Sequence, residues 1–150
     1  MKGWRRRSAE LIHITQTNTE MDSKFVVNTL VGAVAFFFLG YLIYELALGD
    51  VLSGYMDASA EPVMWALTVS QLGLGALMAT VIGAGSARDF ASGAKAGFML
   101  GLMYSVAVMF DLLGTQDIFS STMGAVWATL LESVRFALAG SIVAWWMGRG

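Results

Sequence analysis

Glu132 and Arg135 lie inside an apolar stretch that is long enough to cross a bilayer, "WATLLESVRFALAGSIVAWW" at residues 127–146. Because the two residues are three positions apart, a helix projects them from one face, where the carboxylate and the guanidinium can pair. A charge that faces lipid at this depth costs roughly 2.5–3.5 kcal/mol on insertion scales, so we expect the pair to face other helices. The pair then serves either as a structural salt bridge or as a site for a solute or a proton, and the sequence leaves both open.

Further polar side chains fall at a similar level in the other apolar stretches. They are Glu45 and Tyr41 in the first, Gln71 in the second, and Asp111 with Tyr104 in the third. We therefore predict a polar pocket that opens towards the outer side of the membrane and has Arg135 at its floor. Glu132 is the expected direct partner of Arg135, with Glu45 or Asp111 next. Three carboxylates outnumber one guanidinium, so either one or two acids reach water or one carries a proton.

The composition explains why such charges are unusual in this chain. Of its 150 residues 57% are hydrophobic and 13% are charged, against about 25% charged in an average globular protein. A polar tail at residues 1–24 precedes a domain at 25–150 with four apolar stretches, at 25–48, 63–85, 94–113 and 123–147. Each has roughly the 20 residues needed to cross the hydrocarbon core. We predict an all-α membrane protein, an antiparallel four-helix transmembrane bundle with short connections.

The N-terminal tail does not have the pattern of a cleaved signal. Its basic run, Arg5 to Arg7, is separated from the first apolar stretch, which begins only at Phe25 and is too long for a signal peptide. We expect that stretch to be kept as a helix. The string "MDSKFVVN" at Met21 is a second candidate start, so the choice between Met1 and Met21 stays open.

The distribution of basic residues predicts the orientation. Cytoplasmic loops retain Lys and Arg, and an inside N-terminus puts every basic residue except Arg135 on the cytoplasmic side: Lys2, Arg5, Arg6, Arg7, Lys24, Arg88, Lys95 and Arg149. The outer loops then carry only acids. We predict an integral membrane protein with both termini in the cytoplasm.

Small residues recur at helical spacing in three of the apolar stretches. Gly93, Gly97 and Gly101 are four apart, as in a glycine zipper; the other candidates for close packing are Gly75, Gly83 and Gly140. Helices in lipid associate by van der Waals packing, and small residues let their backbones approach. These faces are expected to pack against protein, either within one chain or between subunits.

Several kinds of chemistry are excluded by residue counts. The chain has no cysteine and a single histidine, His13, so disulfides, cysteine-ligated metals and a bis-histidine haem cannot form in one copy. A net charge of −2 does not favour a nucleic-acid partner. We expect no cofactor and no enzymatic activity, and as partners the lipid bilayer and either a second copy or another membrane protein.

Residues 28–56, "NTLVGAVAFFFLGYLIYELALGDVLSGYM", resemble the opening of a family of small bacterial membrane proteins classed as a domain of unknown function. Phe37, Gly40 and Tyr44 match the Phe-x-x-Gly-x-x-x-Tyr pattern of that family, and the ending "AGSIVAWWMGRG" is similar to its last helix. The resemblance implies a four-helix fold and an inner-membrane location, and it implies no activity.

Two functions follow as hypotheses. The first is an assembly or accessory protein that packs through its small-residue faces. The alternative is a small transporter or channel that uses the pocket at Glu132 and Arg135, with proton uptake by a carboxylate coupled to solute movement.

Overall fold

The computed structural model describes residues 23–47, 54–55, 63–115 and 118–149, and the long elements in these ranges are all helices. The N-terminal helix is α-helical over residues 23–40 and continues as the π-helix η1, Tyr41–Ala47. It is followed by α3, Met64–Ala84, α4, Phe90–Thr115, and α5, Thr122–Met147. The predicted polar tail, apart from residues 23 and 24, and the choice between Met1 and Met21 lie outside the described residues.

Four helices are long and apolar enough to cross a membrane: Ser23–Leu46, Met64–Ala84, Phe90–Thr115 and Thr122–Met147. The prediction of an all-α protein with four such helices is thereby confirmed. Three of the four predicted ranges agree with the observed bounds to within two residues. The third helix differs, because it begins at residue 90 rather than 94.

The early start of α4 has a local cause in the polar segment before it. The Asp89 carboxylate accepts hydrogen bonds from the Ser92 backbone N–H at 2.9 Å and from the Ser92 hydroxyl at 2.8 Å, which caps the first turn. These bonds, the backbone one above all, hold the pKa of the Asp89 carboxyl below its usual value. The cap is therefore present above the ordinary carboxyl pKa and is lost as the pH falls through the lowered one.

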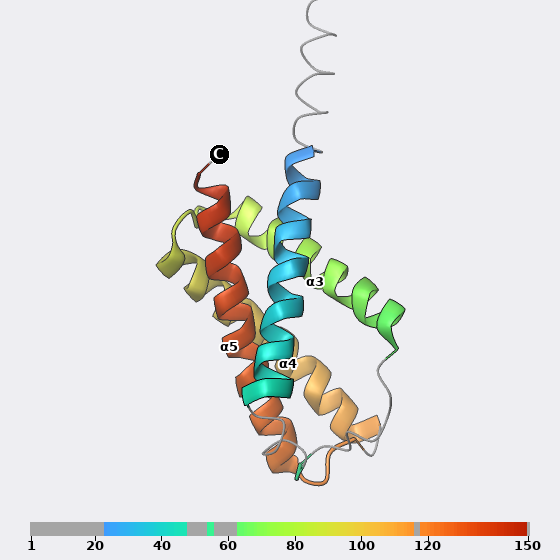
Figure 1. Cartoon of the computed structure of the whole chain (residues 1–150). Helices are drawn as coiled ribbons and strands as arrows, with labels where there is room; N and C mark the ends of the chain where they lie inside the picture. Colours follow the sequence, from blue (N-terminus) through green and yellow to red (C-terminus); the bar gives the residue numbers. More distant parts are fainter. Residues whose placement is uncertain (1–22, 48–53, 56–62, 116–117, 150) are drawn as a thin grey trace, which may run out of the picture.

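The last helix lies at the centre of the fold. About half of the apolar window of α5 is buried, 56%, against 22% in the N-terminal helix, 33% in α3 and 17% in α4. The N-terminal helix runs alongside α5 and α3 crosses them obliquely (Figure 1). Phe36 and Phe136 meet edge to face in the core, with ring centroids 4.7 Å apart. The polar site described below is therefore held by α5 and by the helices around it.

The glycines of α4 bring its backbone against that of α5. A Cβ added at Gly97 would overlap the carbonyl oxygen of Phe136, and one added at Gly93 would overlap that of Gly140. At Gly101 it would overlap the Phe136 side chain. The α4–α5 contact is more extensive than the contacts of α3 with α4 and α5, and these glycines lie on the α4 face that forms it.

A second close approach joins α3 to the N-terminal helix. A Cβ at Gly75 would overlap the Thr29 carbonyl oxygen, and one at Gly32 would come within 2.9 Å of the Gly75 Cα. Gly83 behaves differently, since it is exposed and a Cβ there would meet only the Met147 methyl carbon, at 3.7 Å. Gly83 therefore has no close helix packing within the described part of this chain.

Candidate functional site

Arg135 lies at the middle of α5 and is buried, with 7% of its surface exposed. Its Nη1 donates to both carboxylate oxygens of Glu132, at 2.9 and 3.2 Å, one turn earlier on the same helix. Its Nη2 donates to the Gln71 side-chain oxygen on α3 at 2.7 Å. Nε and Nη2 both donate to the Phe36 carbonyl oxygen on the N-terminal helix, at 3.1 and 2.6 Å. One guanidinium thus connects three helices.

The hydrogen-bonding capacity of this guanidinium is fully used. A guanidinium has five N–H donors, and five hydrogen bonds run from Arg135 to Glu132, Gln71 and Phe36. Glu132, with 4% of its surface exposed, also accepts the Tyr44 hydroxyl at 2.7 Å. A buried charge is tolerated when it is paired and hydrogen-bonded. Both conditions hold for Glu132 and Arg135.

Gly40 opens the path by which Arg135 reaches the Phe36 carbonyl. Phe36, Gly40 and Tyr44 are spaced four apart, so they form one stripe along the N-terminal helix. A Cβ at Gly40 would lie 2.8 Å from Nη2 and 3.0 Å from Cζ of Arg135. The absence of a side chain at Gly40 therefore leaves room for the guanidinium against this face.

The stripe continues directly into η1, which begins at Tyr41. A π-helix is rare, occurs mostly as a short segment of an α-helix and is frequent at functional sites, and helices deviate where a side chain enters the hydrogen-bond ladder. The Phe36 carbonyl, whose usual α-helical partner is the N–H of Gly40, accepts two bonds from Arg135. The change of helix type thus begins at Tyr41, five residues after the carbonyl that the guanidinium contacts.

Gly40→Ala is expected to destabilise the fold by about 1–2 kcal/mol, because the methyl group displaces Arg135 from Phe36 and the loss exceeds the gain in helix propensity. Gly73→Ala is the matched control, since nothing lies within 4 Å of its added Cβ. Unfolding in mixed detergent–SDS micelles measures both free energies. Equal stability of the two variants would show that the fold does not require a residue without a side chain at position 40.

Two cavities flank the network. The larger cavity, about 720 Å³, lies between the N-terminal helix and α3, and the smaller cavity, about 220 Å³, extends between α3, α4 and α5. Both are lined by Tyr44, Gln71 and Arg135. These three side chains and Glu132 therefore form a wall between two spaces, which we call the partition.

The residues of the predicted pocket fall into three groups. Gln71 and Glu132 contact Arg135 directly. Glu45 and Tyr41 line the larger cavity and Tyr104 lines the smaller one, where its ring packs 5.4 Å from that of Phe136. Asp111 is exposed on α4 and lines neither cavity. Neither Glu45 nor Asp111 forms an ion pair with Arg135, whose carboxylate partner among the described residues is Glu132.

Two members of the site were not predicted from the sequence. Tyr44 was not included in the predicted pocket, yet its hydroxyl donates to Glu132. The Phe36 carbonyl carries no sequence signal, because every residue has one. The spacing of Phe36, Gly40 and Tyr44 is a signal that identifies both, since it places a small residue between two aromatic ones on one helix face.

Comparison of the chain with protein-family models, with curated proteins and with solved structures finds no match.

Proposed function

We propose that this chain is a non-enzymatic integral protein of a bacterial inner membrane, an antiparallel four-helix bundle with both termini in the cytoplasm, that binds and passes a small amphipathic solute. The observation that carries this proposal is the pair of cavities that share the partition residues Tyr44, Gln71 and Arg135. A wall made only of side-chain hydrogen bonds can open without any helix unfolding. Opening it would join the two spaces into one path.

The lining of the larger cavity favours a particular class of solute. Phe37, Phe38 and Tyr41 give it aromatic surface, and Glu45 places a carboxylate on it. The Glu45 side chain forms no hydrogen bond or ion pair with any described residue, and the charge of Arg135 is already balanced by Glu132. Aromatic faces together with an unpaired carboxylate attract organic cations. We therefore infer a small aromatic or quaternary ammonium cation as the class of solute.

The test is binding of the aromatic cation ethidium to the protein in lipid nanodiscs. Glu45→Gln is expected to weaken binding roughly fivefold, which corresponds to about 1 kcal/mol for a charge contact in a partly exposed site. Asp111→Asn is the control, because it removes an exposed acid that lines neither cavity. Absence of ethidium binding, or equal binding by the two variants, contradicts a cation site at Glu45.

Movement of the solute requires a second measurement. In proteoliposomes, the double variant Glu132→Ala, Arg135→Ala removes two side chains of the partition, and it is expected to keep its abundance while ethidium flux rises, because the two cavities are then joined. A rise in flux at normal abundance supports transport through the partition. Unchanged flux in the folded double variant would mean that the partition has no part in passing the solute.

An assembly role is the second candidate. It is favoured by the fact that all five N–H donors of Arg135 are already hydrogen-bonded. A guanidinium with all of its donors bound inside one chain is typical of a structural connection. The glycines of α4 and Gly140 pack within the chain, so assembly with a second copy or another membrane protein would use other surfaces. A mass in native nanodiscs above that of one chain supports this candidate, and a monomer without partners counts against it.

A further inference from the structure

A second polar site lies at the other end of the helices from η1, where the N-terminal helix begins and α5 ends (Figure 1). A cavity of about 360 Å³ there is lined by Lys24 and Asn28 from the N-terminal helix, Arg88 from the α3–α4 connection, and Trp146 from α5. Two cations from separate parts of the chain thus face one space.

The α3–α4 connection is held firmly in this position. Nη1 of Arg88 donates to the carbonyl oxygens of Ile82 at 2.9 Å and Ala87 at 2.7 Å, which satisfies the end of α3. A Cβ at Gly148 would overlap the Arg88 carbonyl oxygen, so the end of α5 packs against this connection. Neither Lys24 nor Arg88 forms an ion pair with a described carboxylate, and Asp89 is engaged by Ser92. Among the described residues, the site therefore carries two positive charges with no carboxylate paired to either.

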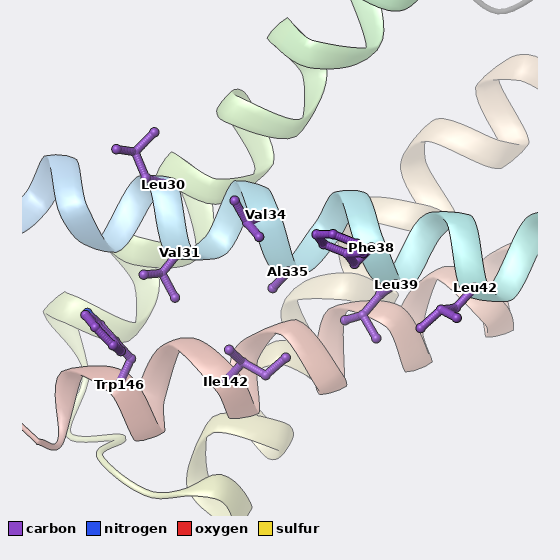
Figure 2. A pocket seen from close by; sticks show the side chains of 9 residues that line it. All are labelled: Leu30, Val31, Val34, Ala35, Phe38, Leu39, Leu42, Ile142 and Trp146. Atoms are coloured by element: carbon purple, nitrogen blue, oxygen red, sulfur yellow. The ribbon is translucent and has the colours of Figure 1, made fainter.

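An apolar groove of about 610 Å³ leads away from this cavity between the N-terminal helix and α5. Val31, Ala35, Leu39 and Leu42 point towards α5, which presents Ile142 and Trp146 (Figure 2). Trp146 lines both the groove and the basic cavity. The polar and apolar spaces thus adjoin at this indole.

The dimensions match one molecule of lipid. The groove extends from Leu30 to Leu42, which is about 18 Å at 1.5 Å per helical residue. One leaflet of the hydrocarbon core is about 15 Å thick. We propose that the site binds an anionic phospholipid, with its phosphate between Lys24 and Arg88 and one acyl chain in the groove.

The charges of Lys24 and Arg88 favour an anionic headgroup, and the apolar groove favours a ligand that has an acyl chain. Basic cavities between membrane helices on the cytoplasmic side hold anionic headgroups, and each Lys or Arg near the surface adds attraction. Free phosphate would satisfy the two cations but leave the groove unexplained. The site shares no lining residue with the partition, although Phe38 lines both the groove and the larger cavity beside Arg135.

Native mass spectrometry of lipid adducts tests the headgroup. The parent protein is expected to retain phosphatidylglycerol in preference to phosphatidylethanolamine with the same acyl chains. Lys24→Gln is expected to reduce that preference about fivefold, the effect of one interfacial charge. Lys95→Gln is the control, because Lys95 is an exposed cation of α4 that does not line the cavity. Equal retention of the two lipids, or equal effects of the two variants, overturns the proposal.

The groove is tested by filling it. Val34→Trp places an indole on a groove-lining position, whereas Val134→Trp places one on an exposed position of α5 outside the groove. Only the first is expected to lower retention of phosphatidylglycerol. Glycerol phosphate, which has the headgroup without acyl chains, is expected to compete poorly. Full competition by glycerol phosphate, or retention unchanged by Val34→Trp, would assign the site to a free phosphate compound. Either result would overturn the proposal that a phospholipid binds there.

Discussion

Glu132→Ala is expected to lower the free energy of unfolding in mixed micelles by about 3–5 kcal/mol, the cost of breaking a buried ion pair from one side. The variant leaves the Arg135 guanidinium buried, with Gln71 and the Phe36 carbonyl as its remaining partners. A guanidinium cannot lose its charge by releasing a proton. The uncompensated charge must then be carried inside the fold or drawn towards water.

Arg135→Ala is expected to cost less, because a carboxyl group left without its cation can take up a proton and become neutral. The double variant is expected to be more stable than Glu132→Ala alone, since it removes both charges. Val134→Ala on the exposed side of the same helix is the control. Stability of Glu132→Ala equal to that of the control would contradict a stabilising ion pair.

Gly97→Leu is expected to give the other large effect, a loss of more than about 3 kcal/mol or failure to fold. Added methylenes in a well-packed core cost about 1–3 kcal/mol when side chains can adjust. Here the first added carbon already overlaps a backbone atom, the Phe136 carbonyl oxygen, which cannot move without α5. The helices must therefore separate along their whole contact.

Gly73→Leu provides the matched control, because a Cβ at Gly73 meets nothing within 4 Å. Both variants introduce the same side chain into a membrane-length helix. SDS unfolding and the yield of folded protein in detergent compare them directly. A Gly97→Leu protein as stable as the Gly73→Leu protein would show that the backbones of α4 and α5 are not in close contact in the folded protein.

The helices were predictable because composition and length fix them. An apolar stretch of about 20 residues must satisfy its backbone internally, and a helix is the simplest way to do so. The start of α4 was predicted four residues late, since "SARDFASG" was taken wholly as a connection. A capping pair, Asp89 and Ser92, is a local signal for the true start.

The site was predictable where chemistry leaves few options. Two opposite charges three residues apart on a helix in lipid pair with each other, and Gln71 lies at the right level to join them. The absence of Asp111 from the site could not be predicted, because helix rotation is set by packing. The glycines of α4 fix that rotation by facing α5, and depth along the helix alone does not reveal it.

The spacing of small residues left open whether they pack within the chain or between subunits. The same four-residue repeat serves both uses, since each requires only that backbones approach. The contacts of Gly93, Gly97 and Gly101 with α5 show that one copy of the chain already uses them. Gly83 lies eight residues after Gly75, two steps of the same repeat, and has no such contact.

The π-helical end of the first helix has a consequence for how this molecule can move. A π turn holds one residue more than an α turn. Rewinding η1 as an α-helix would turn everything beyond the transition by about one residue's rotation, roughly 100°. Glu45 lies within that segment, so rewinding η1 would carry its carboxylate away from the larger cavity.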